Sequence, residues 1–124
     1  MNYGLGGIIS LHRDTKPNKV EETSENVKFG GTRFITFMTY LSDINLGGRT
    51  IFPQVGISVE PIKGSALFWF NHDTKMQADT RVAHMGCPVL IGNKWIANKW
   101  IKMSAQINNI PCSLKHRNFS IFNK

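Results

Sequence analysis

Residues 84–102 of this 124-residue chain read HMGCPVLIGNKWIANKWIK. Two apolar runs lie on either side of Gly92-Asn93, a pair of residues that is typical of a hairpin turn. The second run is rich in Trp and Ile, which favour strands. We therefore predict strands over residues 88–91 and 94–102, with a hairpin turn between them.

The same alternation of short apolar runs and turn residues extends toward the N-terminus. Gly and Pro residues separate most of the runs, and helical periodicity is weak throughout. Many short strands with glycine-rich turns favour an antiparallel sandwich or barrel. Residues 15–32 are polar and are predicted to form a long loop. The remaining predicted strands cover residues 8–14, 33–41, 50–52, 57–60, 65–70 and 81–85.

Composition narrows the class of protein further. The chain has the length of one domain, and 41% of its residues are hydrophobic, so it can bury a core. No stretch approaches the roughly 20 apolar residues that cross a bilayer, and residues 1–4 do not resemble the start of a signal peptide. The formal net charge is +7, but the basic residues are scattered, which favours a solvated surface over a nucleic-acid site.

His12-Arg13-Asp14 is the first candidate for a functional site. Residues two apart on a strand point to the same face, so an imidazole and a carboxylate project side by side. With His84, which follows His12 by 72 positions, they would form the three-ligand facial set of non-heme iron oxygenases. Alone, a His-x-Asp motif is more often a surface pair. His72-Asp73 is a rival pair, but its adjacent side chains would point to opposite faces, and it fits a turn better.

Lys94 and Trp100 form a second candidate group. They are six positions apart and share one face of the predicted strand. An inward lysine is costly without an anionic partner, so Lys94 would suit the carboxylate of a bound acid. The plainer alternatives are a solvent-facing lysine and a core tryptophan.

Together these residues resemble the catalytic region of collagen-type prolyl 4-hydroxylase alpha subunits over nearly the whole chain. The lead-in Asn2-Tyr3-Gly4-Leu5-Gly6-Gly7 is similar to the family's Asn-Tyr-Gly-x-Gly-Gly, and residues 40–43 followed by residues 47–53 are similar to its central hairpin. Residues 84–100 match the family's His-x-x-Cys-Pro-Val and Gly-x-Lys-Trp…Lys-Trp signature. The resemblance implies a mainly β fold, the double-stranded β-helix, which is a jelly-roll or cupin-like barrel.

The resemblance also implies an activity and a set of site residues. The expected enzyme is an Fe(2+)- and 2-oxoglutarate-dependent dioxygenase that hydroxylates peptidyl proline, releases succinate and CO2, and uses L-ascorbate to restore over-oxidised iron. Its catalytic residues would be His12, Asp14 and His84 as iron ligands, with Lys94 binding the distal carboxylate of 2-oxoglutarate. Further residues around the co-substrate would be Tyr3, Thr36 and Trp100.

The same resemblance implies a disulfide, a cellular compartment and partner molecules. Cys87 and Cys112 match the positions of a family disulfide, and a disulfide implies an oxidising compartment, here the endoplasmic reticulum lumen. The expected partners are a proline-rich or collagen-like peptide and a protein disulfide isomerase-type beta subunit. Related nucleic-acid demethylases usually carry an arginine in the role expected of Lys94, so no nucleic-acid partner is expected.

Three features depart from the family pattern. Ile9 stands where the family usually has an aromatic residue, and Arg13 stands between the two proximal ligands. Strand-like sequence begins at the first residues, so we expect residues 1–124 to be a single catalytic domain that lacks its first elements and is the C-terminal part of a longer architecture. The alternative is a truncated, inactive remnant that serves as a binding or structural module.

Overall fold

The computed structural model describes residues 1–15, 31–73 and 77–103. This part of the chain forms ten strands and two short 3-10 helices, η1 (Pro53–Val55) and η2 (Thr80–Val82). None of its helices is long and apolar enough to span a membrane. The strands are β1 (Asn2–Tyr3), β2 (Ile9–His12), β3 (Arg33–Tyr40), β4 (Leu46–Gly47), β5 (Thr50–Phe52), β6 (Ile57–Val59), β7 (Ala66–Phe70), β8 (His84–Gly86), β9 (Val89–Ile91) and β10 (Lys94–Lys102).

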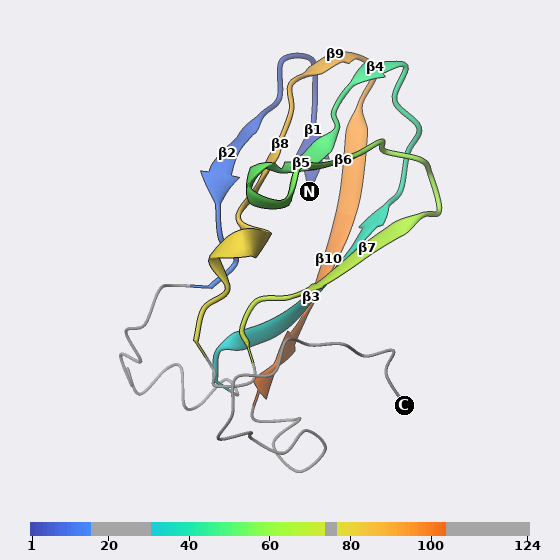
Figure 1. The fold of residues 1–124 in the computed structure, drawn as a ribbon. Coiled ribbons are helices and arrows are strands. Elements are labelled where there is room, and N and C mark those ends of the chain that lie inside the picture. The colour runs from blue at the N-terminus through green and yellow to red at the C-terminus, as the bar shows by residue number, and fades with distance from the viewer. Residues whose placement is uncertain (16–30, 74–76, 104–124) are drawn as a thin grey trace, which may run out of the picture.

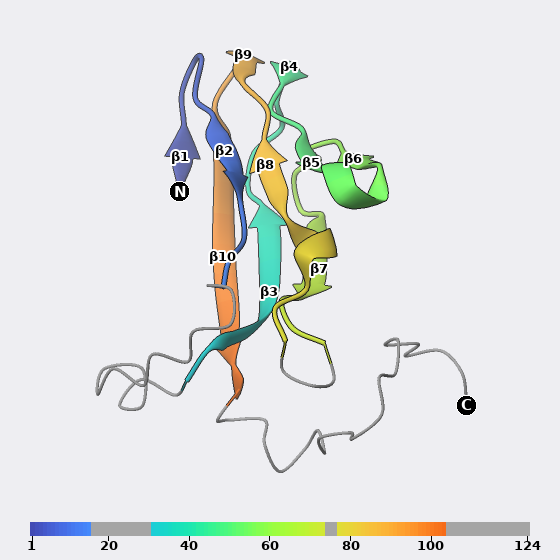
Figure 2. The same cartoon turned by 60° about the vertical axis from the view of Figure 1, so that its left-hand side comes forward.

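The strands form two four-stranded sheets and one two-stranded ribbon. The first sheet has the order β1-β10-β3-β7 and the second has the order β2-β8-β5-β6, while β4 pairs with β9. All of these strand pairs are antiparallel. Figures 1 and 2 show the long strands β3 and β10 on one side and the shorter β2, β8 and β5 on the other. This arrangement confirms the expected mainly β, double-stranded β-helix class.

The core lies between the two sheets. Its central members are buried, and the ring of Phe52 from β5 meets the ring of Trp69 from β7 at a centroid distance of 5.4 Å. This contact joins the second sheet to the first. The buried cluster consists of Met38, Tyr40, Phe52, Trp69 and Ile96.

Strand β3 shows how alternation sorts side chains onto the two faces of a sheet. Thr36, Met38 and Tyr40 are all buried, whereas Phe37 is 42% exposed. Thr36 therefore shares the inward face of β3 with Met38 and Tyr40. Because β3 is hydrogen-bonded to β10 on one side and to β7 on the other, its inward side chains are held at fixed positions.

The predicted strands over residues 33–41 and 94–102 are confirmed as β3 and β10, but the predicted hairpin between residues 88–91 and 94–102 is wrong. The strands that flank Gly92-Asn93 do not pair, since β9 pairs with β4 while β10 pairs with β1 and β3. Turn chemistry is local, whereas the choice of partner strand depends on the whole barrel.

The predicted strand over residues 81–85 is also wrong in part. Residues Thr80–Val82 form the 3-10 helix η2, and the strand β8 begins only at His84. The side chain of Asp79 accepts a hydrogen bond from the backbone N–H of Arg81 and so caps the helix. The predicted loop falls mainly on residues 16–30, which lie outside the described residues, as does Cys112.

The glycine pair before β5 generates a prediction about stability. Gly47 has a φ of +84°, and a Cβ there would lie 2.3 Å from the carbonyl oxygen of Pro88. Gly56 has a similar φ of +67°, but a Cβ there would meet nothing within 4 Å. We expect Gly56→Ala to cost about 1–2 kcal/mol from backbone strain alone, and Gly47→Ala to cost about 1–3 kcal/mol more because of overpacking. Chemical denaturation of both variants measures the difference, and equal losses would contradict the close approach at Gly47.

Candidate functional site

Three side chains of metal-binding type meet where β2 and β8 pair. His12 is the last residue of β2 and lies opposite His84, the first residue of β8. Asp14 follows just after the strand, so chain alternation within β2 does not by itself orient it. The potential ligand atoms of the three residues lie within 4.8 Å of one another. This cluster brings together the His-x-Asp pair and the distal histidine that the sequence singled out.

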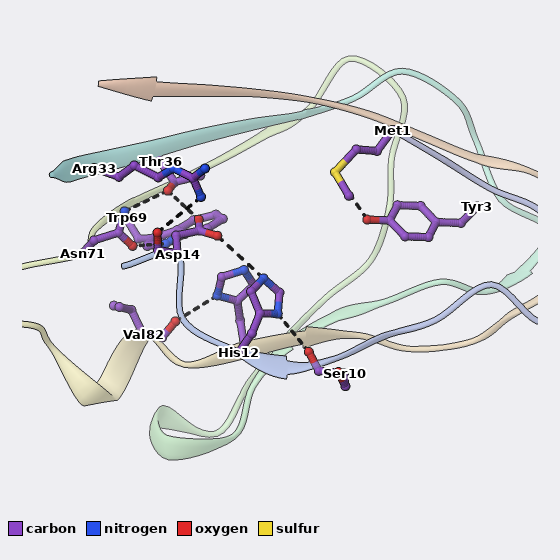
Figure 3. A network of polar contacts seen from close by, with 11 residues as sticks. Met1, Tyr3, Ser10, His12, Asp14, Arg33, Thr36, Trp69, Asn71 and Val82 are labelled. Atoms are coloured by element: carbon purple, nitrogen blue, oxygen red, sulfur yellow. Dashed lines mark hydrogen bonds and ion pairs between the residues drawn. The ribbon is translucent and has the colours of Figure 1, made fainter. Parts of the chain in front are cut away.

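Backbone carbonyls determine the tautomer of both histidines. Nδ1 of His12 lies 2.8 Å from the carbonyl oxygen of Ser10, and Nδ1 of His84 lies 3.0 Å from that of Val82. A carbonyl oxygen only accepts hydrogen bonds, so each Nδ1 carries the proton and donates it. In a neutral imidazole with its proton on Nδ1, Nε2 keeps a free lone pair. The Nε2 of His12 lies 3.6 Å from Oδ1 of Asp14 (Figure 3).

Burial favours the neutral form of His84 that a metal requires. His84 is 6% exposed. The centroid of its ring lies 4.4 Å from that of His12, 4.8 Å from that of Trp69 and 5.4 Å from that of Phe52. Loss of hydration lowers the pKa of His84 below its ordinary value. Two neutral imidazoles and one carboxylate oxygen are the donor set of non-heme Fe(II) sites, so these residues fit that metal.

Asp14 is held from the side away from His12. The hydroxyl of Thr36 donates a 2.6 Å hydrogen bond to Oδ2 of Asp14, and Thr36 has no exposed surface. The guanidinium of Arg33 donates a 3.4 Å hydrogen bond to the backbone carbonyl of Asp14. The structure therefore brings Thr36 to the cluster through the carboxylate.

Lys94 is the second unusual group between the sheets. It is 4% exposed, and its Nζ donates hydrogen bonds to the carbonyl oxygen of Gly48 at 2.7 Å and to Oγ1 of Thr50 at 3.3 Å. Within the described ranges, none of the ion pairs involves this lysine. Desolvation lowers the pKa of Lys94 to about 8. A buried ammonium without a carboxylate partner is suited to receive an anionic ligand.

Tyr3 and Trp100 lie at opposite ends of the face that Lys94 occupies. Tyr3 pairs with Lys94 across β1 and β10, and its ring centroid lies 5.8 Å from the ammonium. Trp100 pairs with Thr36 across β10 and β3, yet it is 37% exposed and the guanidinium of Arg33 covers its ring at 3.7 Å. Tyr3 is therefore near the lysine, whereas Trp100 lies at the solvent edge.

His72 does not join the metal-type cluster. It is 5% exposed, it bridges to Ala78, and its Nε2 lies 3.2 Å from the hydroxyl of Thr15. Burial lowers the pKa of His72. The residue is absent from the one three-ligand group found in the described part of the chain.

Sequence reasoning missed several polar residues that contact the site. Oγ1 of Thr50 accepts hydrogen bonds from the hydroxyl of Tyr40 at 2.7 Å and from Nζ of Lys94 at 3.3 Å. The side-chain amide of Asn71 donates to Oγ1 of Thr36 at 2.9 Å. The sequence offers one signal for both residues, which is a polar residue at the end of an apolar run. Thr50 is the first residue of β5, and Asn71 directly follows the last residue of β7. Their partners lie 10 to 44 positions away, so spacing alone does not reveal them.

Comparison with known proteins points to one group of enzymes. The family model described as the 2OG-Fe(II) oxygenase superfamily matches residues 1–102. The chain is 41% identical over 117 residues to prolyl 4-hydroxylase subunit alpha-1 of Homo sapiens, and 42% identical over 111 residues to subunit alpha-2 of Gallus gallus. These matches cover 91% and 90% of the chain but only 21% and 20% of the relatives, so the chain spans about a fifth of their length.

A solved structure agrees with the sequence matches. The crystal structure of a viral collagen prolyl hydroxylase from Paramecium Bursaria Chlorella virus-1, in complex with 2OG, superimposes with a TM-score of 0.70 at 28% sequence identity. The match covers 80% of this chain and 54% of the viral one.

The buried cluster generates a prediction about metal binding. His12→Ala, Asp14→Ala and His84→Ala are each expected to reduce Fe(II) binding to the background, because a facial set needs all three donors. His72→Ala is the matched control, since His72 and His84 are equally buried histidines. Anaerobic equilibrium dialysis measures the bound iron, and thermal unfolding reports whether each variant is folded. Loss of iron in His72→Ala with retention in His84→Ala would reverse the assignment.

Proposed function

The chain belongs to the 2OG-Fe(II) oxygenase superfamily, and from that premise we propose that it is the catalytic part of a prolyl 4-hydroxylase-like dioxygenase. It would hydroxylate peptidyl proline with Fe(2+), 2-oxoglutarate and dioxygen, and would release succinate and CO2. The observation that carries the proposal is the presence, between the same two sheets, of a His-Asp-His cluster and a buried ammonium that forms no ion pair within the described residues. One group suits the metal and the other suits a dicarboxylic acid.

His12, Asp14 and His84 are proposed to hold the iron. Support comes from the two free Nε2 lone pairs and from the carboxylate oxygen that faces them. Bound iron would supply the redox chemistry that inserts an oxygen atom from dioxygen into a C–H bond. The protein's own contribution is to present three donors on one side and to leave the other side for the co-substrate.

Lys94 is proposed to bind the distal carboxylate of 2-oxoglutarate together with Thr50. An arriving carboxylate would give the ammonium a charge-assisted partner and would offset part of its desolvation cost. Tyr3 is proposed to line the same space, because its ring is close to Nζ. Trp100 would cover the open end with Arg33, and Thr36 would act on the co-substrate only through Asp14, since its proton is already donated there.

The substrate, partners and location form the finer part of the proposal. Prolyl 4-hydroxylase alpha subunits and a collagen prolyl hydroxylase are among the matches, which supports a proline-rich or collagen-like peptide. By the family resemblance we extend this to L-ascorbate as reductant, a protein disulfide isomerase-type beta subunit, the endoplasmic reticulum lumen and a Cys87–Cys112 disulfide. Cys87 is half-buried next to β8 and has no disulfide partner among the residues that the structure covers.

One experiment tests the proposed activity. Anaerobic addition of Fe(II) and then 2-oxoglutarate to the 124-residue chain is expected to give a weak visible charge-transfer band, because the two keto-acid oxygens would chelate the iron. Admission of air with a proline-rich peptide is then expected to give succinate and a peptide heavier by one oxygen atom. A band without peptide oxidation would favour the binding-module alternative, and no band in a folded chain would overturn the proposal.

The role of Lys94 generates a prediction about co-substrate affinity. Lys94→Met is expected to weaken 2-oxoglutarate binding about 10- to 150-fold, because a hydrogen bond to a charged group contributes about 1.5–3 kcal/mol. Lys99→Met is the matched control, since Lys99 lies on the same strand but is exposed. Titration of the anaerobic iron-loaded chain measures both affinities. Equal affinities for Lys94→Met and the unchanged chain would remove Lys94 from the site.

The lowered pKa of Lys94 predicts a pH dependence. Its pKa of about 8 in the folded chain lies below the ordinary 10.5, so above pH 8 the ammonium loses its proton while the chain remains folded. A carboxylate binds the protonated form, so 2-oxoglutarate affinity is expected to fall about tenfold per pH unit above 8. Lys94→Met should show no such fall between pH 8 and 10, and an identical slope in that variant would contradict the assignment.

A further inference from the structure

A chain of hydrogen bonds runs from β7 to the candidate carboxylate ligand (Figure 3). Nε1 of Trp69 donates to Oδ1 of Asn71 at 3.0 Å, and Nδ2 of Asn71 donates to Oγ1 of Thr36 at 2.9 Å. Thr36 then donates to Oδ2 of Asp14 at 2.6 Å. All four side chains are buried, with Trp69 7% exposed and the side chain of Asp14 6% exposed.

The direction of this chain follows from the chemistry of its first member. An indole N–H only donates, so the amide oxygen of Asn71 must face Trp69 and the amide nitrogen must face Thr36. An amide nitrogen also only donates, so the hydroxyl of Thr36 accepts from it and has its single proton left for Asp14. With Asp14 as the carboxylate, no other assignment of protons satisfies the three contacts.

This direction determines which oxygen of Asp14 is available. Oδ2 is occupied by the hydroxyl of Thr36, whereas Oδ1 lies 3.6 Å from Nε2 of His12 and faces the cluster. Charge-assisted hydrogen bonds of this length are strong, so rotation of the carboxylate is opposed. Asp14 is thereby prepared to offer Oδ1 to a metal, while Oδ2 stays hydrogen-bonded to Thr36.

Trp69 also contacts the distal histidine. Its ring packs edge-on against His84 at a centroid distance of 4.8 Å and against Phe52 at 5.4 Å. The side chain of Trp69 therefore acts on two of the candidate ligands. Its ring packs directly against His84, and its N–H acts on Asp14 through Asn71 and Thr36.

We propose that Trp69, Asn71 and Thr36 are positioning residues that hold Asp14 in one-oxygen coordination through a hydrogen-bond chain of fixed direction. The proposal rests on the proposed function, because it takes the cluster as the metal site. Outer partners of ligating side chains typically contribute about 10- to 100-fold to metal affinity. A purely structural role would contribute to folding and leave that affinity unchanged.

The test compares three threonine variants of the 124-residue chain with Co(II) as the probe. Thr36→Val keeps the shape but removes the hydroxyl, and is expected to weaken Co(II) binding by about 10- to 100-fold and to change its visible absorption bands. Thr36→Ser restores the hydroxyl and should bind within about threefold of the unchanged chain. Thr39→Val makes the same change on the outward face of β3 and should not alter affinity. Calorimetry measures the affinities, and circular dichroism checks folding.

A second pair of variants keeps the proposal testable where Thr36→Val fails to fold. Trp69→Phe retains a ring against His84 but removes the N–H, and is expected to weaken Co(II) binding by about 3- to 10-fold, less than the direct partner does. The matched control is Trp95→Phe, because Trp95 is 49% exposed on the other face. Combining Trp69→Phe with Thr36→Val should weaken binding no further than Thr36→Val alone, since both break one chain.

The outcomes separate the two proposals. An unchanged chain that binds neither Co(II) nor Fe(II) overturns the proposed function and the positioning role with it. An unchanged chain that binds metal, with folded Thr36→Val or folded Trp69→Phe binding equally well, overturns the positioning role alone. Loss of thermal stability in these variants without loss of metal affinity has the same meaning.

Discussion

Asp14 and Lys94 lie between two largely apolar sheets, form no ion pair with each other, and are each compensated by neutral polar groups. Burying an uncompensated charge is costly, so these neutral partners constrain how the sheets pack around them. The polar partners of Asp14 and those of Lys94 both include a residue on the inward face of β3. Thr36 serves the carboxylate at one end of that strand, and at the other end Tyr40 donates to Thr50, which contacts the lysine.

The position of β3 within its sheet explains why it can carry both systems. The strand is paired on both edges, with β10 on one side and β7 on the other, so its backbone has little freedom. The two neighbouring strands of β3 each add one residue to these hydrogen-bond networks. Asn71 follows the end of β7 and donates to Thr36, and Lys94 is the first residue of β10. The second sheet contributes both histidines through the β2 and β8 pair. The His12, Asp14 and His84 cluster therefore comes to lie between the same two sheets as Lys94 only when these sheets pack together.

Prediction from sequence succeeded where a long run of strand-favouring residues by itself set the bounds of a strand. Strands β3 and β10 could be bounded because each is a long run of strand-favouring residues. The strand predicted over residues 81–85 was wrong in its first half, because Asp79 caps a 3-10 helix there. The Gly92-Asn93 turn misled because it joins strands of different sheets, and turn chemistry does not report the pairing partner.

By itself the sequence determined the types of donor at the candidate site, since the His-x-Asp motif and the resemblance to a known family single out His12, Asp14, His84 and Lys94. The tertiary structure alone decided how they are used. The free Nε2 lone pairs depend on carbonyls that the backbone happens to aim at Nδ1, and the available oxygen of Asp14 depends on a hydroxyl 22 positions away. Hydrogen bonds are short and directional, so their partners are selected by the meeting of strands in space, which residue spacing along the chain does not encode.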